Sequence, residues 1–163
     1  IVLFLAPFDK STPWSNEGLA GVFRFLQRVW SISQNYIASD TPNNNDANSE
    51  LYAATHAAIK KVSQDIDRMG YNTAISALMQ LTNELYVIEK KHGFAARDGW
   101  QFALTTLTQL LAPFAPHITE ELWQDLGQQG SVHTSAWPVH DEKYLVKDTI
   151  KIAVQVNGNR SCQ

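Results

Sequence analysis

Two prolines three residues apart, Pro113 and Pro116, force a corner between two runs of apolar residues at helical spacing. A proline lacks a backbone N–H and clashes with the preceding turn, so one helix has to end near Leu111 or Ala112. Pro116 suits the first turn of the next helix, where a missing N–H costs nothing. That helix has an apolar stripe made of Ile118, Leu122 and Leu126. The sequence therefore predicts a rigid helix–corner–helix, with Phe114 enclosed in the corner.

Apolar residues at helical spacing predict helices before this corner as well. The expected helices cover residues about 16–38, 49–69, 72–91, 98–111 and 116–127. Residues that favour caps stand before them, namely Ser15, Asn48 or Ser49, Asn72 and Asp98. Gly70 is the expected C-terminal cap of the second helix. Short links imply antiparallel neighbours, so the predicted fold class is all-α, an antiparallel bundle of about five helices.

The two ends of the chain do not follow the helical pattern. Residues 1–6 are apolar but too few to span a bilayer, and no signal peptide is expected. From Thr149 apolar and polar residues alternate, which predicts a strand, and Asn157-Gly158 predicts a hairpin turn. Only five residues follow that turn, so the chain is expected to be a piece of a longer protein. The expected domains are the tail of a preceding catalytic or stem-contact region (1–14), a helical domain (15–130), and a linker with the start of a truncated β subdomain (131–163).

Composition narrows the class of protein. A chain of 163 residues suits one domain. Its net charge of −3 argues against a surface that is basic all over, so a nucleic acid would have to meet a local basic patch. The single cysteine, Cys162, excludes a disulfide framework and a cysteine-based zinc site within the chain. It fits a reducing compartment, and a cytoplasmic protein is expected.

The sequence carries no Gly-rich phosphate loop, nucleophile elbow or HExxH motif. The stretch from His117 to Glu121 could place a histidine and a glutamate on one helix face, as a metal site or an acid–base pair needs. We favour a helix N-terminus whose acids suit the helix dipole, because no third ligand is near in sequence. No metal site and no catalytic residue is predicted, and His56 and His92 need no ligand role. Three tryptophans are expected in the core, namely Trp30, Trp100 and Trp123.

Basic residues gather on helix faces away from the apolar stripes. The candidates for phosphate contacts are Arg24, Arg28, Lys60, Lys61, Arg68, Lys90, Lys91 and Arg97. Arg24 and Arg28 come first because they are i, i+4 neighbours on one face. Acids dominate elsewhere, at Glu120, Glu121, Asp125, Asp141 and Glu142. This segregation predicts a basic side, which a phosphate-backbone footprint needs, although ordinary solvated helix faces explain the same charges and are favoured on composition alone.

The corner sequence from Leu111 to Trp123, LAPFAPHITEELW, resembles the signature corner in the tRNA-binding helical domain of class I synthetases for leucine, isoleucine and valine. Three further stretches are similar to leucyl-tRNA synthetases of the bacterial type, namely residues 6–15, 18–30 and 152–158. His133 and the pair Trp137-Pro138 also fit this family. The resemblance covers nearly the whole chain and is weakest in the Asn-rich loop.

The resemblance implies an α-helical bundle known as the anticodon-binding domain, and a parent enzyme that activates leucine with ATP and Mg²⁺ and transfers it to tRNA. The HIGH and KMSKS motifs of such enzymes are missing here, so this chain should hold no cofactor and catalyse nothing alone. Its expected role is to hold tRNA(Leu) by backbone and shape contacts, so that the acceptor end reaches a catalytic site elsewhere. The corner is expected to be core architecture without a tRNA contact.

The expected partners are tRNA(Leu) and the catalytic and C-terminal domains of the same chain, in a monomer away from membranes. Two alternatives remain open. One is the same domain of a valyl- or isoleucyl-tRNA synthetase, and the other is a non-catalytic helical module that binds a protein through an exposed apolar groove. The tRNA interpretation predicts a basic face, whereas the interaction module predicts a large exposed apolar patch.

Overall fold

The computed structural model describes residues 16–45, 47–145, 154–156 and 159–161. Its helices are α2 (Asn16–Ala38), α3 (Asn48–Asp67), α4 (Tyr71–His92), α5 (Arg97–Leu111) and α6 (Pro116–Asp125). Two short 3-10 helices follow, η1 (Val132–Thr134) and η2 (Glu142–Tyr144), and then two strands, β1 (Val154–Val156) and β2 (Asn159–Ser161). The expected tail at 1–14, the expected N-cap Ser15 and the first part of the expected strand, 149–153, lie outside the described residues.

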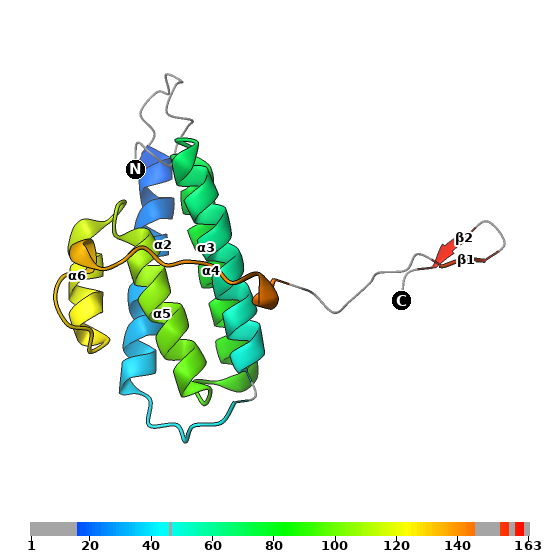
Figure 1. The fold of residues 1–163 in the computed structure, drawn as a ribbon, viewed down its shortest axis with the longest axis horizontal. Coiled ribbons are helices and arrows are strands. Elements are labelled where there is room, and N and C mark those ends of the chain that lie inside the picture. Colours follow the sequence, from blue (N-terminus) through cyan, green and yellow to red (C-terminus); the bar gives the residue numbers. More distant parts are fainter. Residues whose placement is uncertain (1–15, 46, 146–153, 157–158, 162–163) are drawn as a thin grey trace.

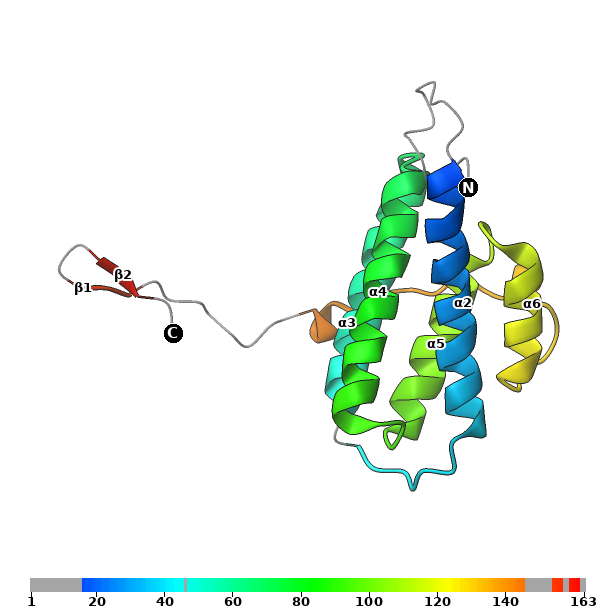
Figure 2. The ribbon, with the colours of Figure 1, turned by 180° about the vertical axis from the view of Figure 1, so that it is seen from behind.

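Four long helices form an elongated bundle, and the shorter α6 lies beside it (Figure 1, Figure 2). α2 and α4 run in one direction and α3 and α5 in the other, as the short connections require. α3 packs against both α4 and α5, while α6 packs against α2 and α5. The all-α antiparallel bundle predicted from the sequence is therefore confirmed.

Large apolar side chains fill the centre of the bundle. Trp100 from α5 is fully buried, and its indole N–H donates to the carbonyl of Gly93 at 3.0 Å. Phe94 packs edge-on against Trp100, with ring centroids 4.8 Å apart. Leucines supply much of the remaining core, among them Leu51, Leu78, Leu85, Leu104, Leu107, Leu110 and Leu122. Burial of each such leucine contributes about 1.5–3 kcal/mol relative to leaving it exposed. Trp100 and Trp123 are buried as predicted.

Trp30 is not a core residue, so that prediction is wrong. The core face of α2 consists of Phe25, Val29, Ile32 and Tyr36, whereas Trp30 keeps 38% of its surface exposed. Trp30 belongs to a second apolar row that faces solvent, which we call the α2 stripe and which consists of Leu19, Phe23, Trp30 and Ile37. Because both rows obey helical spacing, periodicity alone does not tell which of them faces the core.

The end of α3 differs from the predicted cap. Met69, and not Gly70, takes the left-handed conformation there, with φ of 57°. The N–H groups of Met69 and Gly70 donate to the carbonyls of Ile66 and Asp65 at 2.9 and 2.7 Å, which is the Schellman arrangement. Glycine fits position 70 for a different reason, since a Cβ there would lie 2.9 Å from Thr73 Oγ1 and 3.3 Å from the carbonyl oxygen of Asp65, so that these groups would have to shift. The glycine therefore serves close approach and not chain reversal.

The predicted N-caps of α3, α4 and α5 also lie one or two residues inside their helices. Asn48 and Ser49 belong to the first turn of α3, whose N-cap is Ala47. Asn72 and Asp98 belong to the first turns of α4 and α5, whose N-caps are Gly70 and Ala96. Neither cap residue makes a side-chain hydrogen bond to its helix. Local cap preference, worth about 1 kcal/mol, is outweighed here by the contacts that fix the neighbouring backbone.

The Asn-rich loop between α2 and α3 caps α5 from a distance. The backbone N–H of Arg97 donates to Asn43 Oδ1 at 3.0 Å, and that of Gly99 donates to Asn48 Oδ1 at 2.9 Å. These donors belong to the first turn of α5, where a helix leaves its N–H groups unpaired. Residues distant in sequence thus replace the local cap that was expected at Asp98.

The proline corner forms as predicted. α5 ends at Leu111, and Pro116 stands at the start of α6. The carbonyl of Leu111 accepts hydrogen bonds from the N–H groups of Phe114 and Ala115 at 2.9 and 3.1 Å, which closes the turn. Phe114 is partly buried and packs against the main core. The corner thus sends α6 back along the bundle (Figure 2).

After α6 the chain crosses the bundle as the strap, residues 131–145 (Figure 1). Gln109 on α5 holds it, because its amide donates to Ser135 Oγ at 3.1 Å. Farther along, the indole N–H of Trp137 donates to Ser63 Oγ on α3 at 2.8 Å. η2 then packs on α3. The strap therefore connects the corner side of the bundle to α3.

The strand expected at 149–156 is described at Val154–Val156. It pairs antiparallel with Asn159–Ser161, so the residues behind Asn157-Gly158 suffice for a short return strand. That these strands begin a β subdomain stays a prediction.

Candidate nucleic-acid interface

The predicted phosphate-contact residues do not form one cluster. They fall into three groups: Arg24 and Arg28 on α2; Lys60 and Lys61 on α3 with Arg68 at its C-cap; and Lys90, Lys91 and Arg97 where α4 ends and α5 begins. Because α3 and α4 are antiparallel, the C-terminal ends of these two helices lie at opposite ends of the bundle. A nucleic acid touching all three groups would have to run along the bundle.

Arg28 joins two helices of the bundle. Its guanidinium donates to Asn83 Oδ1 at 2.6 Å and lies 4.6 Å from the ring centroid of Tyr86. The hydroxyl of Tyr86 donates in turn to the carbonyl of Arg28 at 3.0 Å. A cation–π contact at a site of this kind is worth about 0.5–1 kcal/mol. Arg28 therefore holds α2 to α4, and a phosphate would have to compete with these contacts.

The side chain of Arg97 makes more internal contacts than that of Arg28. It donates to Ser39 Oγ at 2.8 Å and to the carbonyl of Tyr36 at 3.2 Å, and it lies 4.2 Å from the Tyr36 ring centroid. Burial raises the pKa of Tyr36, and the positive charge of Arg97 opposes that rise. The protonated phenol donates to the carbonyl of Arg97 at 3.2 Å. Arg97 thus fastens the end of α2 to the start of α5.

Three of the candidate lysines are held in ion pairs. Lys60 pairs with Glu142 at 2.7 Å, Lys61 with Asp65 at 2.6 Å and Lys91 with Glu50 at 2.6 Å. The hydrogen bond from Lys91 lowers the pKa of Glu50, and the one from Lys60 does the same for Glu142. The predicted segregation of charge is wrong at this point, because the strap brings Glu142 to Lys60 and α3 itself supplies the acids that pair with Lys61 and Lys91.

The remaining three candidates are exposed, and their side chains have no partner within the described ranges. They are Arg24, Arg68 and Lys90. A phosphate could bind them without breaking an internal contact of that part of the chain. They are therefore stronger candidates than the five cations whose side chains already have partners in the fold.

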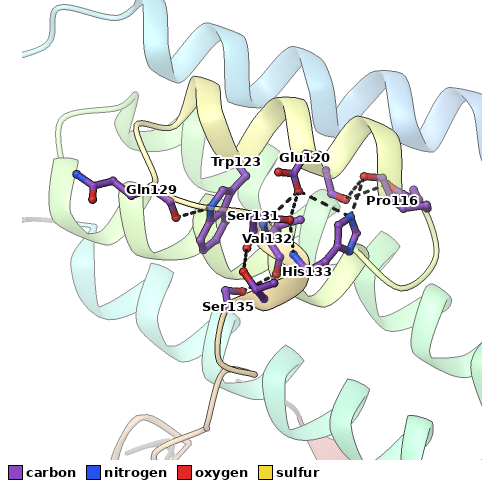
Figure 3. A network of polar contacts seen from close by, with 11 residues as sticks. Pro116, Glu120, Trp123, Gln129, Ser131, Val132, His133 and Ser135 are labelled. Atoms are coloured by element: carbon purple, nitrogen blue, oxygen red, sulfur yellow. Dashed lines mark hydrogen bonds and ion pairs between the residues drawn. The ribbon is translucent and has the colours of Figure 1, made fainter.

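A polar network that the sequence did not predict fixes the strap to α6 (Figure 3). Glu120 Oε2 accepts hydrogen bonds from Ser131 Oγ at 2.8 Å and from the N–H of Val132 at 3.2 Å. His133 Nε2 lies 3.8 Å from the same carboxylate and 3.3 Å from the carbonyl of Pro116. The sequence analysis singled out both His133 and Glu120, but no local pattern predicted that they lie close together. Glu120 thus anchors the strap instead of only suiting the helix dipole.

A second unpredicted contact, the aromatic clasp, consists of Tyr52, His56, Phe102 and Tyr144. It joins α3, α5 and the strap. His56 looked isolated in the sequence, yet its Nδ1 accepts the backbone N–H of Asp141 at 3.1 Å. Burial lowers the pKa of His56, which favours the neutral ring that this hydrogen bond requires.

Among the residues that the structure describes, no group of three or more His, Cys, Asp or Glu side chains could hold a metal ion. No helix within the described ranges is long and apolar enough to cross a membrane.

The antiparallel bundle and the proline corner define a class of all-α helical domain. The chain belongs to the family described as the anticodon-binding domain of tRNA ligase, whose family model matches residues 48–161. The match begins at α3, so α2 precedes the matched region.

Comparison with individual relatives indicates which tRNA ligases this chain is similar to. The chain is 43% identical over 160 residues to a leucine–tRNA ligase of Herpetosiphon aurantiacus and 41% identical over 157 residues to one of Deinococcus radiodurans. Each comparison covers 96% of this chain but 19% of the relative. The chain therefore spans about a fifth of the length of these relatives. The similarity to leucine–tRNA ligases agrees with the resemblance found at residues 6–15 and 18–30.

A solved structure shares the fold. The ternary LeuRS–tRNA–LeuAMS complex from Agrobacterium radiobacter K84 matches with a TM-score of 0.78 and 31% identity. The match covers 98% of this chain and 21% of that chain.

Proposed function

We propose that this chain is the tRNA-binding helical domain of a leucine–tRNA ligase. It holds the body of tRNA(Leu) while the catalytic domain of the parent protein uses ATP and Mg²⁺ to join leucine to the acceptor end. The parent protein acts in the cytoplasm as a monomer. The observation that carries this proposal is the likeness in sequence and fold to a LeuRS solved in a complex with tRNA.

The charges on the bundle support a phosphate-backbone role. Arg24, Arg68 and Lys90 are exposed, and no contact of the described residues neutralises them. Each phosphate that such a cation neutralises releases counterions, which favours binding at low salt. The net charge of −3 keeps the general attraction to nucleic acid small, so binding depends on these local groups. The other five candidates contribute less, because each has to leave a partner.

A filter-binding titration of the full-length protein with a tRNA(Leu) transcript tests this role. Arg24→Ala should weaken binding by roughly three- to tenfold at low salt and reduce the salt slope by about one. Lys61→Ala is the matched control, because Lys61 is paired with Asp65 and should change the affinity less. Unchanged affinity of an Arg24→Ala, Arg28→Ala double variant at low salt would remove both residues from the interface.

The α2 stripe favours a second role for this domain, which is contact with another domain of the same chain. Its four exposed apolar side chains support a contact surface of the kind that the interaction-module alternative predicts. Phe23 in this row keeps 61% of its surface exposed. About four-fifths of the length of the relatives lies outside this chain, and α2 precedes the family match. We therefore assign the stripe to contact with the catalytic or the C-terminal domain.

Limited proteolysis of the full-length protein tests that contact. Phe23→Ser should loosen the domain contact and speed cleavage between domains by several-fold. Val87→Ser is the control, because Val87 is 65% exposed on α4 and outside the stripe. Equal cleavage rates for the two variants would contradict the assignment.

A further inference from the structure

A cavity of about 690 Å³ lies between the proline corner, the end of α3, the start of α4 and the strap. Three aromatic side chains line it, namely Tyr71, Phe114 and Trp137, and two polar residues join them, Ser63 and Asp67. The proposed phosphate contacts make no use of this space. A concave apolar site with a few polar groups is the usual form of a ligand site, and its volume suits a nucleotide.

The aromatic rings of the cavity are held in place. The rings of Tyr71 and Phe114 meet edge to face, with centroids 6.3 Å apart and planes inclined by 70°. The indole N–H of Trp137 donates to Ser63 Oγ at 2.8 Å, while 41% of the Trp137 surface stays exposed. Fixed aromatic walls with open faces favour a flat ring as the occupant, because stacking needs little reorganisation.

The polar groups at the cavity indicate which flat ring fits. The carboxylate of Asp67 is exposed and accepts no hydrogen bond from the described residues. A carboxylate can accept two parallel N–H bonds, and the Watson–Crick edge of guanine presents N1–H and N2–H side by side. The next residue, Arg68, is exposed and unpaired within the described ranges, and it can bind a phosphate.

An arginine of a protein partner could also stack on Trp137 and pair with Asp67. The charge of Arg68 would repel such an arginine, whereas it would attract the phosphate of a nucleotide. The carboxylate of Asp67, which lines the cavity, acts in the opposite sense, and Arg68 follows it in sequence without lining the cavity. The choice of RNA as the occupant therefore rests on the proposed function, which brings tRNA to this domain.

We propose that this cavity, which we call the aromatic pocket, takes one unpaired guanine of the bound tRNA. The base stacks on Trp137, its Watson–Crick edge meets Asp67, and its phosphate lies near Arg68. This inference rests on the proposed function for the presence of the tRNA. It adds a base contact to the backbone and shape contacts expected of the domain, and it places the tRNA beside the proline corner, where the sequence predicted no tRNA contact.

Equilibrium filter binding of the full-length protein to a tRNA(Leu) transcript at fixed salt tests the pocket. Asp67→Asn keeps the size of the side chain and should weaken binding about fivefold, because an amide oxygen cannot take both guanine N–H groups. Trp137→Ala should weaken binding about tenfold, within the range of base–aromatic stacking. Val139→Ala is the matched control, because Val139 lies in the same strap, is 81% exposed and does not line the pocket. Its affinity should equal that of the wild type.

Competition with free nucleotides checks the identity of the base. GMP at millimolar concentration should displace the transcript better than AMP, and Asp67→Asn should abolish this difference. Thermal unfolding of each variant is measured alongside. Because Trp137→Ala also removes a hydrogen bond of the strap, Asp67→Asn is the decisive variant.

The outcomes separate this inference from the proposed function. Wild-type affinity of Asp67→Asn together with weakened binding of Arg24→Ala overturns the pocket and leaves the proposed function standing. A wild-type protein that does not bind the transcript overturns both. GMP binding that depends on Asp67 without any change in tRNA affinity assigns the pocket to a free nucleotide and overturns the RNA assignment. If Asp67→Asn leaves the tRNA affinity unchanged but speeds proteolysis of residues 131–145, the pocket is assigned to a protein side chain. That result also overturns the RNA assignment.

Discussion

The imidazole ring of His56 on α3 is stacked on the phenol ring of Tyr144 in η2, with ring centroids 4.6 Å apart and planes inclined by 7°. Tyr52, one turn earlier on α3, also stacks on Tyr144, with centroids 5.2 Å apart. The backbone N–H of Asp141 donates to His56 Nδ1, so this nitrogen carries no proton. At this point the strap is therefore fastened to α3 by stacked rings and by a hydrogen bond that a protonated imidazole cannot accept. The Trp137–Ser63 hydrogen bond and the Lys60–Glu142 ion pair join the same two segments.

Tyr144→Ala should destabilise the chain by about 1–3 kcal/mol, because it removes the stacking contacts with His56 and Tyr52 and the apolar area they bury. Urea unfolding of the 163-residue chain measures this loss. Tyr144→Phe is the matched control, since it keeps the ring, and its stability should stay within about 0.5 kcal/mol of the wild type. A double-mutant cycle with His56→Ala should give a coupling of about 1 kcal/mol. A coupling near zero would mean that the stack does not fasten the strap.

Stability should fall as the pH drops below the ordinary His56 pKa of 6.5. Burial is the main cause that lowers the folded-state pKa of His56; His140 and Lys143 lower it further, and Asp141 opposes them. Between the lowered folded value and 6.5 the unfolded chain binds more protons than the folded chain. The contribution of His56 is therefore fully present above 6.5 and lost as the pH falls through the folded value, with a slope of at most about 1.4 kcal/mol per pH unit.

Urea unfolding of the wild type and His56→Asn between pH 5 and pH 8 isolates this contribution. The asparagine can place an oxygen near the position of Nδ1, but it does not titrate in this range. The two proteins differ only at position 56, so the difference between the two curves reports the replacement of His56. Parallel curves across the whole range would show that His56 is not the group responsible.

Local chemistry was sufficient to predict the helices and the corner from the sequence. It predicted the helix ends only in part. The missing N–H of Pro116 sets the start of α6 wherever the chain is placed. At the end of α3 the sequence indicated a reversal at Gly70, because glycine adopts positive φ without strain. The reversal falls on Met69 instead, and a Cβ at Gly70 would crowd Thr73. Tertiary contacts decide which of the two adjacent residues adopts positive φ, and local conformational preference does not include these contacts.

The candidate interface was harder to predict than the fold. Arg28 and Arg97 lie off the predicted apolar stripes, and this made them candidates for solvent-exposed phosphate contacts. Their actual neighbours are the rings of Tyr86 and Tyr36, which come from other helices. Periodicity places a side chain on a face but does not reveal what the fold brings against that face. Arg24 is exposed and unpaired in the described part of the chain. Only the packed bundle distinguishes it from Arg28 and Arg97, whose side chains contact other helices.

Gly93→Ala should destabilise the chain by about 1–3 kcal/mol. Gly93 ends α4 with φ of 63° and ψ of −152°, a combination that is essentially restricted to glycine. An added Cβ would meet nothing within 4 Å, so the whole cost comes from the backbone conformation. Gly21→Ala is the matched control, because Gly21 lies inside α2 with equally open space around it. It should stabilise the chain by about 0.5–1 kcal/mol. Thermal unfolding compares the two variants, and changes of the same sign would contradict this account.

Glu120→Ala should detach the strap from α6 and cost about 1–3 kcal/mol, because it removes the acceptor of Ser131 Oγ and of the Val132 N–H. Hydrogen exchange of the Val132 amide measures the detachment directly, and its protection should fall by about tenfold. Glu121→Ala is the control, because the neighbouring Glu121 is exposed and makes no hydrogen bond with the described residues. Its Val132 amide should exchange at the wild-type rate. Equal protection in both variants would show that the carboxylate of Glu120 does not hold the strap, and the anchoring would then fall to the indole and stacking contacts of Trp137 and Tyr144.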